Sequence, residues 1–204
     1  MSPAAPVRPF RSWLASVNGD GAYGVALAGA CLLLLASELG GEPARLALRY
    51  ERAPIAAGEL WRLLTGHFVH LSFHHALLNV LGLALMWALF ARDYPPRRWL
   101  LICAASIAVI DVGLWLGDST VQWYVGSSGL LHGIMAAGTL AHLRRRQAEG
   151  WILAVFLVAK LCYEQFAGPL PFVTGATVVV DAHLYGAVGG LAAAVLLSLR
   201  PQSV

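Results

Sequence analysis

Residues 126–133 decide the fold and the chemistry expected of this chain, and they read Gly-Ser-Ser-Gly-Leu-Leu-His-Gly. They open an apolar stretch and place Ser128 among small neighbours where a helix begins. The first turn of a helix leaves backbone N–H groups without acceptors, so a hydroxyl there has the surroundings of a nucleophile. Small residues are also common in membrane helices for packing reasons. The stretch therefore gains weight only if other reactive groups reach the same depth.

Composition places the chain in a lipid bilayer. Of its 204 residues, 58% are hydrophobic and 12% are charged, whereas soluble domains carry about 25% charged residues. The net charge is +3, but the basic residues lie in short loops beside apolar runs. This pattern is typical of loops that set membrane orientation, and it does not indicate a nucleic-acid-binding surface. The cysteines form no CxxC pair, which predicts neither a disulfide nor a zinc site: Cys31, Cys103 and Cys162.

Six apolar runs predict an all-α polytopic membrane protein with a six-transmembrane-helix bundle. The expected spans are roughly 22–39, 73–91, 97–116, 127–143, 150–167 and 180–199. Each approaches the length needed to cross a hydrocarbon core of about 30 Å. They form one domain, 22–199, between an N-terminal segment, 1–21, and a tail, 200–204. A cleaved signal peptide is the competing interpretation of the first run, because residues 35–37 are compatible with a cleavage site. That run is long for a signal peptide, and five more follow.

Loop charges predict the orientation. Nine arginines fall on the N-terminal side of the membrane, namely Arg8, Arg11, Arg92, Arg97, Arg98, Arg144, Arg145, Arg146 and Arg200. By the positive-inside rule both termini are then cytoplasmic, and the second, fourth and sixth spans run from outside to inside. We expect a multi-pass protein of a bacterial inner membrane whose reactive groups open to the periplasmic, outer side.

This topology converts sequence positions into depths. His75 and Asn79 lie in the opening turns of the second span, Ser128 opens the fourth, and His183 lies in the first turn of the sixth. All these helices start from the outer side, so the groups share one depth, and polar side chains at membrane depth are usually functional. His183 is the candidate base for a Ser128 nucleophile. The Asn79 amide, a His75 N–H and the backbone at Ser128 are candidate oxyanion donors.

Glycines on the sixth span predict how the serine and histidine meet. Gly186 and Gly190 follow His183 at three and seven residues, on the same helical face. Such a stripe lets two helices approach closely, which brings the fourth and sixth spans together.

Three motifs then resemble one family, the rhomboid intramembrane serine proteases. Residues 126–129 resemble its GxSG motif, through Gly126 and Gly129, and residues 182–190 resemble its AHxxGxxxG motif. Trp61 and Arg62, followed by His67, His70, His75 and Asn79, resemble the Trp-Arg loop and the HxxxxHxxxN pattern that opens helix 2.

The resemblance implies a serine endopeptidase with a Ser–His dyad that cleaves membrane-anchored proteins near the outer face of the bilayer. Carried over by position, Ser128 is the nucleophile, His183 the base, and His75 with Asn79 line the oxyanion hole. Trp61, Arg62 and His70 belong to a structural first loop. The implied fold is a six-helix bundle with a water-filled cavity open to the outside and lateral access for substrate. No cofactor or metal is implied; membrane-anchored substrates and the lipid bilayer are the expected partners.

One departure points to a branch of the family. Four residues after the serine, many rhomboids place an aromatic residue, whereas this chain has His132. This form, in a short chain, resembles the rhombosortase branch, which is associated with C-terminal GlyGly-CTERM sorting tails. The implied substrate is a secreted or surface protein held by such a tail.

Other interpretations of single residues stay open. Ser127 is an alternative nucleophile, although the motif selects the serine before Gly129. Five histidines could suggest a metal or haem site, but no carboxylate or cysteine in the sequence completes a set: His67, His70, His74, His75 and His132. Lys160 and Glu164, four apart, read as a structural ion pair more than a substrate contact. Asp181 points away from His183 on a helix, and Asp111 has no evident partner.

Two other functions compete with a protease. The chain could be an inactive relative that binds and escorts membrane substrates, which loss of the serine or histidine would signal. It could also be a small transporter or metal-binding membrane protein that uses its histidines, which would show flux or bound metal. Both reactive residues are present, so the sequence favours the protease.

Overall fold

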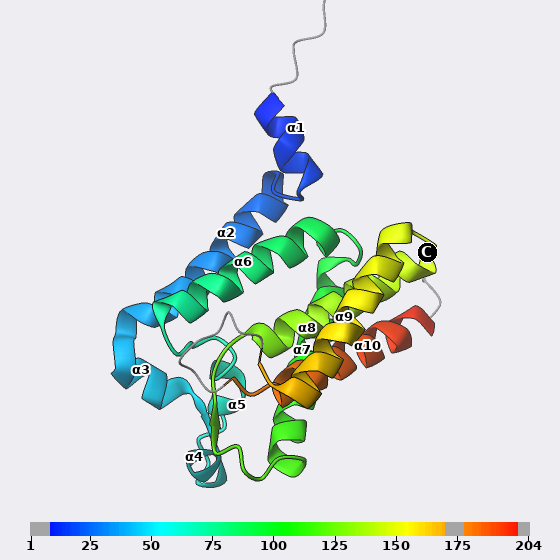
Figure 1. Ribbon diagram of the computed structural model, residues 1–204. Coiled ribbons are helices and arrows are strands. Elements are labelled where there is room, and N and C mark those ends of the chain that lie inside the picture. The colour runs from blue at the N-terminus through cyan, green and yellow to red at the C-terminus, as the bar shows by residue number, and fades with distance from the viewer. Residues whose placement is uncertain (1–8, 170–177, 200–204) are drawn as a thin grey trace, which may run out of the picture.

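The computed structural model describes residues 9–169 and 178–199 of the chain. This part consists of helices joined by short connections and one small sheet (Figure 1). The longer helices are α2 (Gly21–Ala36), α6 (Phe73–Phe90), α7 (Pro96–Leu116), α8 (Ser128–Arg144), α9 (Ala148–Ala167) and α10 (Asp181–Leu199). A helix thus lies at each of the six expected positions, with ends within three residues of the expected ones. The tail 200–204 lies outside the described residues.

Five of these helices in the described residues are long and apolar enough to cross a membrane. The first of them continues from α2 through the 3-10 turn η1 (Ser37–Gly40) into α3 (Gly41–Leu48). Helix α8 is not among these five; it has 17 residues, or about 26 Å of rise against a core of about 30 Å. A six-span count and cytoplasmic termini therefore stay predictions. The N-terminal segment, 1–21, contains α1 (Pro9–Ser16).

Helix α8 is the centre of the bundle and contacts α6, α7, α9 and α10 (Figure 1). Buried positions run around its whole circumference, and many of them are small: Gly129, Gly133, Ala136, Ala137, Gly138 and Ala141. A helix enclosed on all sides needs small residues because its neighbours approach its backbone closely. In contrast, α2 lies beside α6 at the edge and buries only Leu34 among its own residues.

Glycines bring α8 and α10 into backbone contact, as the glycine stripe predicted. A Cβ added at Gly186 would lie 2.7 Å from the carbonyl carbon of Gly129, and one at Gly190 would lie 2.6 Å from the carbonyl carbon of Gly133. In the other direction, a Cβ at Gly129 would lie 2.7 Å from the carbonyl oxygen of Ala182. No larger residue fits at these positions, so the spacing of the two helices depends on them.

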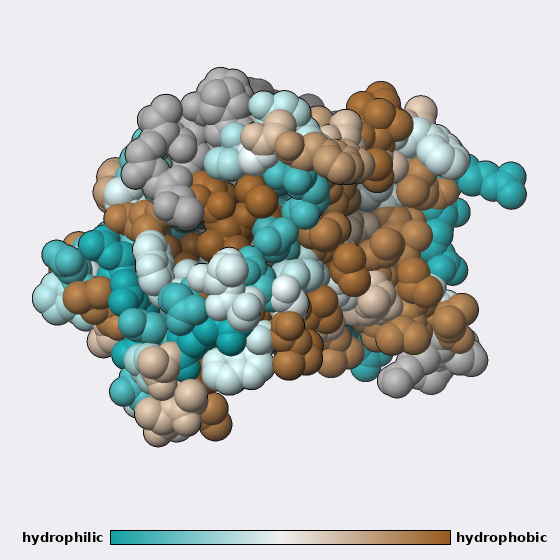
Figure 2. Space-filling model, turned by 60° about the horizontal axis from the view of Figure 1, so that its bottom comes forward, coloured by the Kyte–Doolittle hydropathy of each residue, from teal (hydrophilic) through white to brown (hydrophobic). Residues whose placement is uncertain are grey.

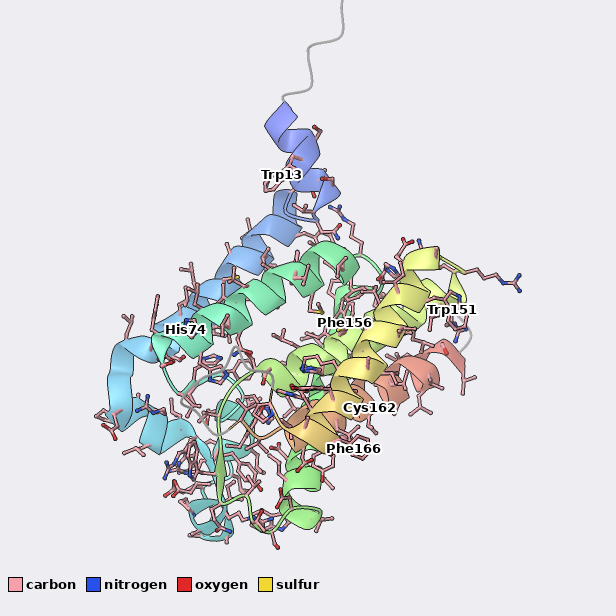
Figure 3. All side chains as sticks on the ribbon, viewed as in Figure 1. Trp13, His74, Trp151, Phe156, Cys162 and Phe166 are labelled. Atoms are coloured by element: carbon pink, nitrogen blue, oxygen red, sulfur yellow. The ribbon has the colours of Figure 1, made fainter. Side chains whose placement is uncertain are left out.

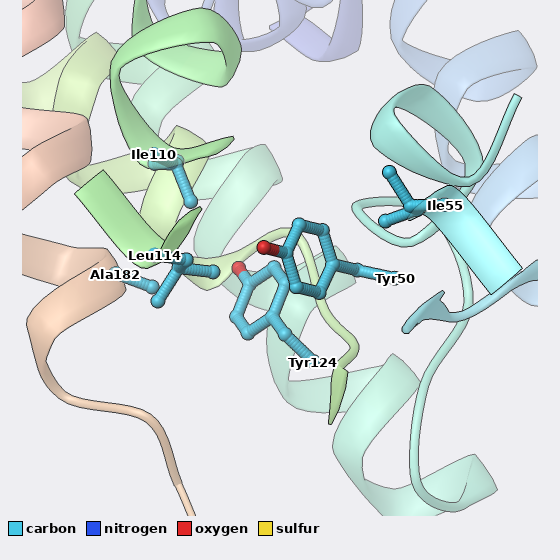
Figure 4. Packing of buried hydrophobic residues seen from close by; sticks show 6 residues of the cluster. All are labelled: Tyr50, Ile55, Ile110, Leu114, Tyr124 and Ala182. Carbon is cyan, nitrogen blue, oxygen red and sulfur yellow. The ribbon is translucent and has the colours of Figure 1, made fainter. Parts of the chain in front are cut away.

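The first loop braces the outer end of the bundle. It holds α4 (Arg52–Ala56), α5 (Arg62–Thr65) and the strand β1 (Tyr50–Glu51), which pairs antiparallel with β2 (Trp123–Tyr124). Figure 4 shows Tyr50 and Tyr124 side by side, in a cluster completed by Ile55, Ile110, Leu114 and Ala182. The cluster packs the loop against α7 and the start of α10. Its member Tyr124 directly precedes the turn that leads to Ser128.

Arg62 organises this loop from a buried position, where its side chain contacts several groups. Its Nε donates to Glu59 Oε2 at 2.6 Å, and its Nη1 donates to the backbone carbonyls of Leu46 and Arg49 at 2.8 and 3.0 Å. The neighbouring Trp61 is 53% exposed. Arg62 is therefore the structural member of the Trp-Arg pair, as a buried guanidinium must be satisfied by acceptors.

Large apolar side chains cover the outside of the bundle. In Figure 2 hydrophobic residues dominate a broad area, while hydrophilic residues gather at the lower left. Along α9, Trp151 and Phe166 project outward (Figure 3) and are 66% and 91% exposed. Water would penalise such a surface, whereas lipid stabilises it. The protein is a multi-pass integral membrane protein.

The glycine contact makes a direct prediction about stability. Gly186→Val should lower the free energy of unfolding by about 1–3 kcal/mol or more, because the added atoms collide with the α8 backbone. Gly29→Val in α2 is the matched control, since no atom lies within 4 Å of a Cβ added there. Thermal unfolding in detergent checks both variants. Equal midpoints for the two would show that α8 and α10 do not depend on this contact.

Candidate active site

The turn between β2 and α8 fixes the position of Ser128. Gly126 has a φ of +115°, a backbone conformation that residues other than glycine rarely adopt. A Cβ there would also lie 2.9 Å from His75 Cε1. Its N–H donates to the Gly66 carbonyl at 3.0 Å, and its carbonyl accepts from the Tyr124 hydroxyl at 2.5 Å. The turn is therefore held from both sides, and α8 begins at Ser128, where the first backbone N–H groups have no acceptor within the helix.

The structure brings Ser128 and His183 together. Ser128 Oγ lies 2.9 Å from His183 Nε2, although 55 residues separate them. Ser128 is half-buried, whereas His183 is 5% exposed. The contact follows from the glycine packing of α8 on α10, because both side chains stand in the first turns of these helices.

A carboxylate that the sequence analysis did not assign to the site lies on the other edge of the imidazole. Glu164 Oε2 is 2.9 Å from His183 Nδ1, and Glu164 Oε1 is 2.7 Å from Lys160 Nζ. The expected Lys160–Glu164 ion pair is thus confirmed, but Glu164 has a second partner. One signal could have found it: Glu164 stands near the end of α9, which puts it at the depth where α8 and α10 begin.

These contacts select one tautomer of His183. An ionised carboxylate only accepts hydrogen bonds, so Nδ1 carries the proton and donates to Glu164. Nε2 then holds a lone pair and accepts from the Ser128 hydroxyl. This is the protonation that a base needs in order to take the serine proton.

His132 packs against His183. Its ring stacks on that of His183 with centroids 4.2 Å apart and planes at 17°. Its Nδ1 lies 2.7 Å from the carbonyl oxygen of Ser128 and donates to it, since a carbonyl only accepts. The histidine therefore does the packing expected of an aromatic residue at this position.

The two candidate oxyanion donors stand on α6, facing Ser128. His75 Nδ1 accepts from the Leu71 N–H at 3.4 Å, which leaves Nε2 as the protonated nitrogen of the neutral ring. Asn79 is buried, and its Nδ2 donates to the His75 carbonyl at 3.0 Å. A second Nδ2 hydrogen remains available to a ligand.

A cavity of about 280 Å³ adjoins these groups. Its lining combines polar residues, His75, Asn79, Ser128, His132, Lys160, Glu164 and His183, with apolar ones that include Leu78, Met86, Leu131, Met135 and Phe156. A second cavity of about 20 Å³ touches both Ser128 and His75, which is room for about one water molecule. The site can thus take an apolar chain and one water.

Ser127 has a different environment from Ser128. It is 2% exposed, and its Oγ lies 3.3 Å from Nε2 of the buried His70. His70 therefore ties the first loop to the start of α8, as its interpretation as a loop-stabilising residue expected. Burial, followed by the charge of nearby His75, lowers the pKa of His70 to about 4.

Two further groups were not anticipated. Asp111, which lacked an evident partner in the sequence, has its Oδ1 3.2 Å from His67 Nε2. Tyr124 is 3% exposed, and burial raises the pKa of its hydroxyl. Its hydrogen bonds with the Gly129 N–H and the Ser128 side chain partly offset this rise in pKa. An aromatic residue before the turn carries no signal for this role in sequence alone.

One group of side chains in the described residues could hold a metal ion, namely His132, Glu164 and His183, whose ligand atoms lie within 4.8 Å of one another. The sequence analysis expected no carboxylate near the histidines, and Glu164 corrects this. The donor set fits a cation poorly, because the Lys160 ammonium occupies one Glu164 oxygen and His183 Nε2 binds Ser128. His70 and His74, with ligand-like spacing, diverge: His70 is buried, and His74 points outward (Figure 3).

Comparisons with known proteins all point to one family. A family model described as the rhomboid domain matches residues 57–200. The chain is 28% identical over 136 residues to the putative rhomboid protease YdcA of Bacillus subtilis, covering 67% of this chain and 66% of that one. It is 26% identical over 198 residues to the rhomboid protease GlpG of Klebsiella pneumoniae, covering 94% of this chain and 68% of that one.

The depressed pKa of His70 predicts a pH dependence of stability. The folded-state value of about 4 lies below the value of about 6.5 for an unfolded chain. The neutral ring therefore stabilises the fold above pH 6.5, and this contribution, on the order of 2 kcal/mol, declines as the pH falls from 6.5 toward 4. His70→Gln should lose less stability than wild type between pH 7.5 and 4.5, as measured by thermal unfolding. Parallel losses in both proteins would contradict this.

Proposed function

Since the chain belongs to the rhomboid family, we propose that it is an intramembrane serine endopeptidase in which Ser128 is the nucleophile and His183 the general base. The observation that carries this proposal is the 2.9 Å contact between Ser128 Oγ and His183 Nε2, both of which line the cavity. Hydroxyl, base and space for a substrate meet at one point, which is the geometry that acyl transfer needs.

The reaction follows from this geometry. Ser128 Oγ attacks the carbonyl carbon of the scissile bond while its proton passes to His183 Nε2, and the carbonyl oxygen takes the negative charge. Collapse of this intermediate breaks the C–N bond, and His183 returns the proton to the leaving amine. A water deprotonated by His183 then hydrolyses the acyl ester and restores the serine.

The oxyanion is assigned to donors on two helices. The Ser128 backbone N–H stands at the α8 N-terminus, and His75 Nε2–H and Asn79 Nδ2 face it from α6 across the cavity. One such donor can contribute about 2.7–4 kcal/mol to catalysis. A polar cavity below the surface also supplies the water that the second half of the reaction consumes.

We assign the membrane placement from charge and from the direction of the helices. Ser128 opens α8, His183 lies in the first turn of α10 and His75 in that of α6, while arginines gather at the other ends of these helices: Arg92, Arg144, Arg145 and Arg146. By the positive-inside rule this proposal has six spans, cytoplasmic termini, and a site that opens to the outer side of a bacterial inner membrane.

For the substrate we propose a membrane-anchored protein with a GlyGly-CTERM-type tail, as in the rhombosortase branch. Two features support this choice: His132 at the position four residues after Ser128, and the apolar side chains that line the cavity beside the site. Glycines approach a half-buried serine with little steric hindrance, and the apolar lining accepts the hydrophobic span that follows them.

Cleavage of a membrane-anchored reporter with such a tail tests the function. Ser128→Ala and His183→Ala should each lose cleavage by about 1,000-fold or more, because nucleophile and base act as one unit. Ser127→Ala is the matched control, an identical change one residue away at a buried hydroxyl, and should retain cleavage. Blotting for the released product from co-expressing cells provides the measurement.

The outcomes separate the competing functions. Undiminished cleavage by Ser128→Ala would contradict the assignment of the nucleophile. If wild type cleaves no reporter, a fluorophosphonate probe decides between a wrong substrate and no protease. Labelling that depends on Ser128 would retain the protease and discard the tail, whereas absence of labelling would favour an inactive protein that binds and escorts membrane substrates.

A further inference from the structure

We propose that Glu164 is the positioning residue of His183, so that the site works as a Ser128–His183–Glu164 chain of hydrogen bonds with Lys160 as the residue that orients the carboxylate. This inference rests on the proposed function, because it assigns a role to Glu164 through the base. It is carried by two contacts on opposite edges of one ring, Nε2 to Ser128 Oγ and Nδ1 to Glu164 Oε2, both 2.9 Å.

The setting of Glu164 supports a role beyond pairing with Lys160. A carboxylate in a membrane helix is costly and seldom retained without a function, and Glu164 is 3% exposed. Neutralising Lys160 needs one oxygen, at 2.7 Å. The second oxygen points to the imidazole of a different helix, where it accepts the Nδ1 proton. The carboxylate thus divides its two oxygens between a cation and the base.

This division defines what Glu164 does during the reaction. Before proton transfer it holds the tautomer in which Nε2 is unprotonated and turns the ring toward Ser128. When Nε2 takes the serine proton, the ring becomes an imidazolium, and the carboxylate stabilises that charge while Nδ1 keeps its proton. The ring of His132 stacks on one face of the His183 ring, with centroids 4.2 Å apart, and limits its rotation.

Lys160 makes the arrangement directional. Its ammonium has only donors, so whatever group occupies position 164 must present an acceptor to it. In Glu164→Gln the amide oxygen would therefore turn toward Lys160, and the NH₂ group would face His183 Nδ1. An NH₂ at Nδ1 stabilises the opposite tautomer, in which Nε2 carries a proton and accepts none from Ser128.

The test uses the rate of labelling by a fluorophosphonate, which requires no knowledge of the natural substrate. In that reaction a bond forms between Ser128 Oγ and phosphorus, the P–F bond breaks with loss of fluoride, and the serine proton passes to His183 Nε2. Glu164→Gln should lower the maximal labelling rate by at least about 100-fold and change the half-saturating probe concentration by less than about threefold. Glu149→Gln, the same change at an exposed position of α9, should label like wild type.

A double variant separates positioning from charge neutralisation. Lys160→Met with Glu164→Met removes both charges and leaves apolar side chains of similar length, a change that buried ion pairs often tolerate. If Glu164 only neutralises Lys160, this variant should label like wild type. We expect it instead to retain the wild-type unfolding midpoint and to label at least about 100-fold more slowly.

Two outcomes would overturn the proposal. One is a double variant that labels within about threefold of the wild-type rate, and the other is a Glu164→Gln variant that labels within the same limit. If wild type itself is not labelled at Ser128, the proposed protease function fails. That failure is seen before any variant is compared, so the two are distinguishable.

Discussion

Backbone contact between α8 and α10 is the constraint on which the rest of the site depends. Gly129 and Gly133 face Gly186 and Gly190 so closely that a single added methyl group would overlap a carbonyl. Ser128 and His183 are 55 residues apart in sequence and stand on different helices. They can share a hydrogen bond only if the axes of these helices approach to this extent. The glycines therefore act as spacers of fixed size between serine and histidine.

Around this contact the molecule arranges three supports. The first loop, held by Arg62 and by the Tyr50–Tyr124 cluster, fixes the turn that precedes Ser128. Helix α6 supplies His75 and Asn79 from the opposite wall of the cavity. Helix α9 brings the Lys160–Glu164 pair to the far edge of the base. Each support comes from a different segment, so the site exists only when the whole bundle is assembled.

Much of this could be predicted from the sequence because membrane helices leave strong signals. Apolar run length located α2, α6, α7, α8, α9 and α10 to within three residues at each end, and the depth argument placed Ser128, His183, His75 and Asn79 together. The residues it missed share a cause. Glu164 looked satisfied by its neighbour Lys160, and Asp111 looked unpaired, because the partners that define them, His183 and His67, are distant in sequence. Residue spacing reports contacts along one helix, not contacts between helices.

The central claim is that Ser128, His183 and Glu164 form one chain of hydrogen bonds with a single tautomer of the imidazole. Nitrogen chemical shifts of His183 test it most directly, in protein labelled with ¹⁵N-histidine and assigned by the signals that His183→Asn removes. We expect a protonated Nδ1 and an unprotonated Nε2 in the resting protein at pH 8. A resting ring protonated at Nε2, or one that exchanges between both tautomers, would contradict it.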